Sequence, residues 1–323
     1  MLNHRLADCS TSAISHTPRE VAWDLRLGLA IFSAAVGSGA LVLAQFASTA
    51  EVVEVYATVT DKKGQPAIGL TADAFTVLED GAAHPVSVFA AGEFALSVVI
   101  AIDRSFSMTT RGLETARAGA GRLIDQLRAQ DRLMILAIGG GVETVAGFEM
   151  PRELARQALD RVALWGSSPI GDTVLQAVDA SGQQRGRRAV VLWSDGVERE
   201  AQHSRADVLD RARGSNVLIY PVAVAPAISP LLAELAALSG GHVLQARDRK
   251  AAERAAGVIA GELRHQYLLG YTPPPGPGGW RRIEVRVNRP DLRVRARQGY
   301  VAPASDRKAS SGAAAASNEM GVR

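Results

Sequence analysis

The strongest constraint on the fold is an uninterrupted apolar run that ends in polar residues, at positions 96–108 (LSVVIAIDRSFSM). A run without alternation is typical of a strand buried on both faces, as in a parallel sheet covered by helices. Asp103, Ser105 and Ser107 follow its apolar part, so one carboxylate and two hydroxyls fall within a single turn. Open α/β sheets bind ligands at the carboxyl ends of their strands, and hard oxygen groups suit a small hard cation. This turn is therefore a candidate Mg²⁺ site.

Two later segments make this interpretation more specific, since Asp and Ser alone also describe an ordinary turn. A second apolar strand, at residues 189–193, ends in Ser194-Asp195-Gly196. A loop rich in hydroxyls, GSSPIGD at residues 166–172, lies between the two strands. Together the three segments predict a site made of carboxylate and hydroxyl oxygens, for which Mg²⁺ is the best match and Mn²⁺ or Ca²⁺ also fit.

Residues 95–265 alternate buried strands with amphipathic helices. Further apolar strands are expected at residues 133–138 and 217–224, and helices at residues 113–127 and from Pro151 onward. Strands and helices of these lengths indicate βαβ units. The predicted fold class is therefore α/β, with a doubly wound, mostly parallel, Rossmann-like sheet flanked by helices. In this topology the carboxylates that follow two of the strands converge at one edge of the sheet.

Strand patterns also flank the α/β segment. Residues 51–94 contain an alternating run from Val53 to Val59, followed by turn signals and shorter apolar runs. Residues 266–302 contain further strands on either side of a connector rich in Pro and Gly. We expect the two segments to form one smaller β domain, built from the parts of the chain before and after the α/β domain.

The amino-terminal end of the chain predicts export. Residues 1–26 are polar and are expected to be a cytoplasmic leader, whereas residues 27–50 contain no charged residue and are long enough to cross a bilayer. Two interpretations stay open, a signal peptide cleaved after Ala44 and an uncleaved anchor. In both, the basic residues before the segment keep the amino end in the cytoplasm, and the rest becomes periplasmic or secreted. Residues 303–323, rich in Ala, Ser and charge, are expected to be a disordered tail.

Composition and missing motifs exclude several functions. The net charge is only +3 and no nucleic-acid-binding motif is present, so no nucleic-acid partner is expected. The single cysteine, Cys9, precedes the hydrophobic segment, so the exported part has no disulfide and no cysteine-based zinc site. No P-loop or His-Glu-x-x-His motif occurs, and no Gly-x-Ser-x-Gly elbow surrounds Ser105, Ser107 or Ser168. A non-enzymatic protein is expected, with a metal-assisted hydrolase as the weaker alternative.

The three polar segments resemble the metal-ion-dependent adhesion site of the von Willebrand factor type A (VWA) family, in its bacterial VWFA-related type. The resemblance continues into the flanking strands through Tyr-x-Leu-x-Tyr and Arg-x-Gly-Tyr, here Tyr267, Leu269, Tyr271, Arg297, Gly299 and Tyr300. It therefore covers residues 52–303. Phe106 stands where glycine is common in the family.

The resemblance also implies a role for each site residue. The residues that it assigns to the metal are Asp103, Ser105, Ser107, Ser168 and Asp195. The serines would bind the ion through their hydroxyls, and the two aspartates would hold its waters. Thr173 is the second choice for the third hydroxyl, in place of Ser168, because the family usually has Thr there.

The function that the resemblance implies is an extracytoplasmic, non-enzymatic module for protein interaction or adhesion. Its bound Mg²⁺ would take an Asp or Glu carboxylate of a protein partner, and contact with a membrane is expected only through the amino-terminal segment. A structural VWA module with a non-functional metal site is the alternative.

Overall fold

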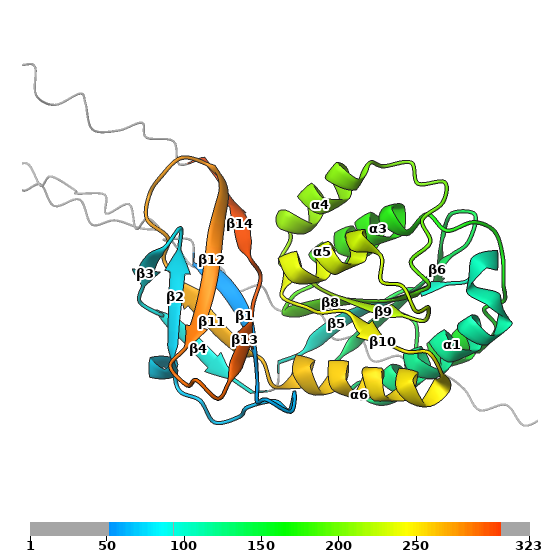
Figure 1. Ribbon diagram of the computed structural model, residues 1–323, viewed down its shortest axis with the longest axis horizontal. Helices are drawn as coiled ribbons and strands as arrows, with labels where there is room; N and C mark the ends of the chain where they lie inside the picture. Colours follow the sequence, from blue (N-terminus) through cyan, green and yellow to red (C-terminus); the bar gives the residue numbers. More distant parts are fainter. Residues whose placement is uncertain (1–51, 93, 305–323) are drawn as a thin grey trace, which may run out of the picture. The chain divides into compact units, whose positions relative to one another are not determined.

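The computed structural model describes residues 52–92 and 94–304 (Figure 1). The predicted leader at residues 1–26, the hydrophobic segment at residues 27–50 and the tail from residue 305 onward lie outside the described residues. Within the described ranges, no helix combines the length and the hydropathy that crossing a membrane requires.

A six-stranded sheet forms the centre of the α/β part, in the order β10-β9-β8-β5-β6-β7. Its strands are β5 (Leu96–Asp103), β6 (Arg132–Ile138), β7 (Val142–Ala146), β8 (Arg187–Ser194), β9 (Leu218–Ala223) and β10 (Leu244–Gln245). All neighbouring strands are parallel except β6 and β7. Every residue of β5 is buried, as its apolar run predicts for a central strand. The predicted fold class is confirmed.

Helices cover both faces of this sheet (Figure 1). They are α1 (Thr109–Asp125), α2 (Arg152–Asp160), α3 (Ile170–Gly182), α4 (Arg205–Arg213), α5 (Pro230–Ser239) and α6 (Arg249–Arg264). Alternate residues of β5 point into two separate cores. Ile100 and Ile102 pack with α1, α2 and α6, whereas Val99 and Ala101 pack with α3, α4 and α5. The carboxyl edge of the sheet between these two helical layers is left to loops, and the candidate site lies there.

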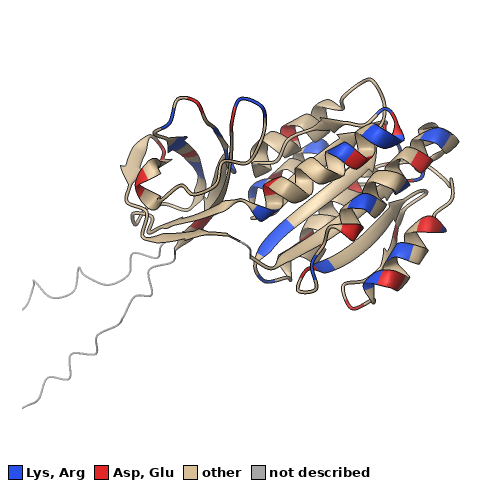
Figure 2. Ribbon diagram, turned by 90° about the horizontal axis from the view of Figure 1, so that it is seen from below, with Lys and Arg blue, Asp and Glu red and all other residues tan. Residues whose placement is uncertain are grey.

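The charged residues of the helices mix both signs along their exposed faces (Figure 2). Some form pairs one helical turn apart, such as Arg249 and Glu253 on α6, whose side chains are 2.9 Å apart. Exposed pairs of this kind contribute little to stability.

Two four-stranded antiparallel sheets form the β domain, in the orders β13-β1-β11-β4 and β14-β12-β2-β3. Their strands are β1 (Val53–Thr60), β2 (Phe75–Glu79), β3 (Ala82–His84), β4 (Val88–Ala91), β11 (Tyr267–Tyr271), β12 (Gly279–Val287), β13 (Arg293–Arg295) and β14 (Gly299–Ala302). Single 3₁₀ turns lie at Ala72–Ala74 before β2 and at Phe106–Met108 after β5. Strands from before and after the α/β domain pair with each other in both sheets, β1 with β11 and β2 with β12. The β domain is therefore built from both parts of the chain, and the two sheets share one core.

A buried carboxylate joins the two sheets of the β domain. Glu79 accepts hydrogen bonds from the Tyr271 hydroxyl (2.6 Å), the Tyr300 hydroxyl (3.0 Å) and the Arg281 guanidinium (2.8 Å). Tyr271 lies in one sheet, whereas Glu79, Arg281 and Tyr300 lie in the other. These partners compensate the cost of burying the charge.

We expect Glu79→Ala to lower the free energy of unfolding by about 3 kcal/mol, because it leaves the buried hydroxyls of Tyr271 and Tyr300 without their acceptor and removes the carboxylate that pairs with the partly buried Arg281. Urea unfolding of the full chain, followed by circular dichroism, measures the change. Glu284→Ala on β12 is the control, since Glu284 is half exposed and its ion pair within the described part of the chain is with the exposed Arg286. A change below about 0.5 kcal/mol is expected there. Equal losses in the two variants would contradict the prediction.

Candidate functional site

The carboxylate of Asp103 is the centre of the candidate site. It lies at the end of β5 and is fully buried. Its Oδ1 accepts a hydrogen bond from the Ser105 N–H (2.9 Å). Its Oδ2 accepts from the hydroxyls of Ser168 (2.9 Å) and Ser194 (2.6 Å). One carboxylate thus joins the end of β5, the loop before α3 and the end of β8, which are the three segments that the sequence predicts to meet.

The two serines that follow β5 continue the polar site toward the surface. The hydroxyls of Ser105 and Ser107 are 3.0 Å apart. Ser105 is buried and Ser107 is exposed, because the chain turns through a single 3₁₀ turn between β5 and α1. The site therefore runs from a buried carboxylate to a hydroxyl that solvent or a partner can reach.

The structure distinguishes between the two candidates for the third hydroxyl. Ser168 is fully buried and donates to Asp103. Thr173 is also fully buried, but its hydroxyl donates to the Pro169 carbonyl oxygen (2.9 Å) within the first turn of α3. Thr173 is therefore engaged by its own helix, and Ser168 is the residue that faces the site.

Asp195 lies one residue beyond β8 and is partly exposed. Its Oδ1 accepts a hydrogen bond from the Val197 N–H (3.0 Å), which closes a small turn. Among the hydrogen bonds of the described residues, none joins this carboxylate to the other four predicted site residues. The structure thus places Asp195 at the same sheet edge but does not bring it into the network around Asp103.

Ser194 is a site residue that sequence reasoning did not assign. It accepts a hydrogen bond from the Gly196 N–H (2.9 Å) and donates to Asp103. The pairing of Ile102 with Trp193 places Ser194 directly beside Asp103 in the parallel register. The sequence signal for this residue is the Ser-Asp-Gly motif. Only the register of β5 against β8 shows that its serine lies beside Asp103.

The Asp103 carboxylate is buried among neutral hydrogen-bond donors. Burial raises the pKa of Asp103 above its ordinary value, while the hydrogen bonds from Ser105, Ser194 and Ser168 act in the opposite direction. All of these donors are neutral. In the described part of the chain no Lys or Arg pairs with Asp103, and neighbouring Arg104 pairs with Glu143 instead (2.5 Å). A buried anion without a protein counter-ion, beside hydroxyl oxygens, fits a hard divalent cation.

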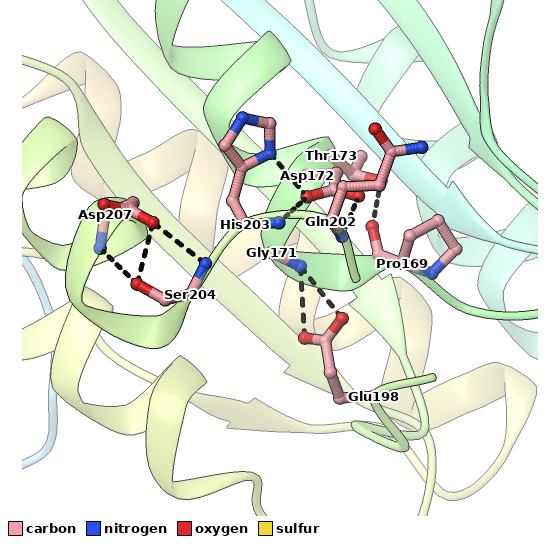
Figure 3. A network of polar contacts seen from close by, with 9 residues as sticks. All are labelled: Pro169, Gly171, Asp172, Thr173, Glu198, Gln202, His203, Ser204 and Asp207. Atoms are coloured by element: carbon pink, nitrogen blue, oxygen red, sulfur yellow. Dashed lines mark hydrogen bonds and ion pairs between the residues drawn. The ribbon is translucent and has the colours of Figure 1, made fainter. Parts of the chain in front are cut away.

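A second polar network holds the loop that follows β8 (Figure 3). Asp172, on the first turn of α3, accepts hydrogen bonds from the Gln202 N–H (2.9 Å) and the His203 N–H (3.0 Å), and its carboxylate is 2.8 Å from the His203 ring Nδ1. Glu198 accepts from the Gly171 N–H at the start of the same helix (3.1 Å). The loop therefore places one carboxylate, Glu198, at the N-terminus of α3, where anions are favoured. The helix in turn places a second carboxylate, Asp172, against the loop backbone.

The pKa values of the two carboxylates of this network are shifted in opposite directions. Burial raises the pKa of Asp172, but the hydrogen bonds from Gln202 and His203 outweigh it, so that the net shift is downward. Burial raises the pKa of Glu198, and the backbone N–H groups of α3 offset only part of this effect. The network also supports the site directly, because the Arg199 N–H donates to the Ser168 carbonyl oxygen (2.9 Å).

The candidate site is not a cluster of the side chains that most often bind metals. Within residues 52–92 and 94–304, no three His, Cys, Asp or Glu side chains are grouped so that they could hold a metal ion. The candidate site instead combines the Asp103 carboxylate with serine hydroxyls, and Asp195 lies at the same sheet edge. Such oxygen donors suit only oxygen-seeking cations.

Comparison with known proteins identifies the α/β part. Residues 97–256 match the family described as von Willebrand factor type A domain. These residues form a VWA domain. The family resemblance predicted from the sequence is confirmed, and the matched range includes the predicted metal residues of all three segments.

Several solved structures are similar to part of this chain. An aerotolerance-related membrane protein from Bacteroides fragilis is 19% identical, with 51% of this chain and 98% of that chain covered and a TM-score of 0.44. The protein BatB from Bacteroides thetaiotaomicron is 20% identical, with 51% and 98% covered and a TM-score of 0.42. Proximal thread matrix protein 1 from the mussel byssus is 12% identical, with 58% and 51% covered and a TM-score of 0.46. No curated protein sequence matches the chain.

We expect Asp172→Ala to release the loop that follows β8. The loss of its hydrogen bonds to the loop should lower the free energy of unfolding by about 2 kcal/mol at neutral pH. It should also accelerate amide hydrogen exchange at Gln202 and His203. Because the pKa of Asp172 is lowered in the folded protein, this stabilisation is present at neutral pH. It is lost as the pH falls from about 3.8 through the lower folded-state pKa.

Asp179→Ala on the same helix is the matched control, because Asp179 is half exposed and, among the described residues, its ion pair is with Arg211 (3.1 Å). We expect a change below about 0.5 kcal/mol and unchanged exchange at Gln202 and His203. Exchange rates that stay the same in Asp172→Ala would show that the loop does not depend on this carboxylate.

Proposed function

We propose that this VWA domain binds a protein partner through a divalent cation, Mg²⁺ in the first place, held at the carboxyl edge of its sheet. VWA domains are a family of protein-interaction modules, and this chain contains one at residues 97–256. The proposal adds the metal, its ligands and the chemistry of the partner.

The observation that carries the proposal is the fully buried Asp103 carboxylate, which has only neutral hydrogen-bond donors around it. An ionised carboxylate is costly to bury unless a cation or strong donors compensate it. Here a bound cation beside the serine hydroxyls would supply the missing charge. The exposed hydroxyl of Ser107, 3.0 Å from that of Ser105, extends the oxygen ligands to the surface.

Each residue has a distinct role in this proposal. Ser105, Ser107 and Ser168 would bind the cation through their hydroxyls, and Asp103 and Asp195 would hold its waters. Asp103 would also keep the hydroxyls of Ser168 and Ser194 oriented by accepting their hydrogen bonds. When bound among neutral ligands, Mg²⁺ supplies positive charge and an open coordination position that an Asp or Glu carboxylate of a partner can fill.

We propose a non-enzymatic role because the serines of the site lack the environment of a nucleophile. In the described part of the chain, no histidine hydrogen-bonds to Ser105, Ser107 or Ser168. His203, on the neighbouring loop, is held by Asp172. Activation of a serine needs a base that is free to take its proton. The carboxylate that Ser168 contacts, Asp103, also accepts hydrogen bonds from Ser105 and Ser194 and is assigned here to the cation.

We also propose that the domain acts outside the cytoplasm, in the periplasm or as a secreted protein. The support is the uncharged segment at residues 27–50 with basic residues before it, together with a single cysteine that precedes this segment.

The thermal midpoint of the full chain tests metal binding. Because a ligand that binds only the folded state stabilises it by about 2.7 kcal/mol at 100 times its Kd, millimolar Mg²⁺ or Mn²⁺ should raise the midpoint by several degrees above its value in EDTA. We expect Asp103→Ala, Ser107→Ala and Ser168→Ala to lose this rise.

Ser167→Ala is the matched control, since Ser167 is adjacent to Ser168 but its hydroxyl donates to Glu200 on the outside of the loop. It should keep the metal-dependent rise. Ser107→Ala guards against simple misfolding, because Ser107 is exposed and its removal leaves the Asp103 network intact. No rise in the parent protein with either metal would favour the alternative, a structural VWA domain with a non-functional metal site.

A further inference from the structure

Four large apolar side chains stay exposed on the loops around the candidate site. They are Phe106 (67% exposed), Trp165 (61%), Ile228 (44%) and Val197 (38%), here called the apolar rim. None of them belongs to either core of the α/β domain. Single exposed apolar residues are common on soluble proteins. Four on separate loops beside one polar site are a feature that marks interaction surfaces.

Phe106 and Trp165 lie on one side of the site. Phe106 stands between Ser105 and Ser107, and its N–H donates to the Gly166 carbonyl oxygen (3.1 Å). The Trp165 N–H donates to the Arg104 carbonyl oxygen (2.7 Å), so the two loops are in direct contact. A Cβ on Gly139, just after β6, would lie 2.3 Å from the Trp165 carbonyl oxygen. This pair therefore lies on two touching loops beside the ends of β5 and β6.

Val197 and Ile228 lie on the other side. Val197 follows Asp195 after β8, and Ile228 follows β9. The two loops touch, because a Cβ on Gly196 would lie 3.0 Å from the Cβ of Ser229. Since the sheet order is β9-β8-β5-β6, the polar site between β8 and β5 lies between the two apolar pairs.

The charges around the rim limit what can bind there. Arg104 is already paired with Glu143. Beside the rim a groove of about 1060 Å³ is rich in carboxylates, with Arg211 as its one Lys or Arg among the described lining residues; its acidic members are Asp172, Asp179, Glu200, Asp207 and Asp210. A partner segment with a run of acidic residues would be repelled by this groove, whereas a single carboxylate would reach the cation site without that cost.

We infer that the partner of this domain presents one Asp or Glu between apolar side chains, which the apolar rim contacts on both sides of the cation site. This inference rests on the proposed function, because the carboxylate is to be taken by the cation. A cation alone would bind any accessible carboxylate. The apolar rim would favour those carboxylates that have apolar side chains beside them. Aromatic anchors such as Trp165 and Phe106 are the residue types that dominate binding energy at interfaces.

A phage-displayed library of random dodecapeptides, selected on the purified full chain in millimolar MgCl₂ and eluted with EDTA, tests the inference. We expect enriched peptides to carry one Asp or Glu with aromatic or long aliphatic residues within two positions on both sides. A synthetic peptide of the most enriched sequence then serves as the probe in fluorescence polarisation.

Variants separate the rim from the rest of the surface. We expect Trp165→Ser and Phe106→Ser each to weaken peptide binding by about tenfold or more. Trp280→Ser is the matched control, because Trp280 is an exposed tryptophan of the β domain, and it should change binding by less than about twofold. Unchanged thermal midpoints in EDTA show that the serine variants are folded.

The outcomes distinguish the inference from the proposed function. Metal-dependent peptides with a carboxylate but random neighbours, or equal affinity for the parent and Trp165→Ser, would overturn the inference and leave the proposed function standing. Apolar peptides that bind equally well in EDTA would contradict both. A library without enriched peptides would overturn the inference, while the metal-dependent thermal midpoint still judges the cation site.

Discussion

The buried carboxylate of Asp103 is the interaction on which the functional edge of this protein depends. Three segments that are far apart in the sequence donate hydrogen bonds to it, from Ser105, Ser168 and Ser194. Its position follows from the fold, because β5 and β8 are adjacent parallel strands whose carboxyl ends must lie at the same edge. Burial without a protein cation makes the anion costly, and the neutral hydroxyls only partly offset that cost. In the proposed function a bound cation would balance this charge.

The loop after β8 is held in place by an exchange of carboxylates with α3. The Asp172 carboxylate, on α3, accepts hydrogen bonds from the loop N–H groups of Gln202 and His203. The Glu198 carboxylate, on the loop, accepts one from the Gly171 N–H at the start of α3. A loop next to a binding site would otherwise be among the least stable parts of a domain. This anchoring, together with the hydrogen bond from the Arg199 N–H to the Ser168 carbonyl oxygen, fixes the loop relative to α3 and to the candidate site.

Much of this arrangement could be predicted from the sequence, since the relevant signals are local. The unbroken apolar run of β5 identifies a central strand, and polar residues after two such strands predict a shared edge. The choice between Ser168 and Thr173 could not be made, because it depends on where α3 begins and on which hydroxyl its own backbone engages. The role of Ser194 depends on register, and the anchoring by Asp172 and Glu198 depends on the path of a loop without periodicity. Tertiary contacts of this kind leave no pattern in the chain.

In the proposed function, the polar site would provide affinity for a carboxylate, and the loops around it would provide selectivity. Neutral hydroxyl ligands would leave a bound cation with charge to share, which favours any carboxylate and therefore gives affinity without selectivity. The exposed faces of Phe106 and Trp165 on one side and of Val197 and Ile228 on the other add a contact that depends on the residues beside that carboxylate. The acidic groove next to them would disfavour partners with several negative charges. Specificity would then come from the loops, which can vary without disturbing the strands and the buried carboxylate that hold the cation site together.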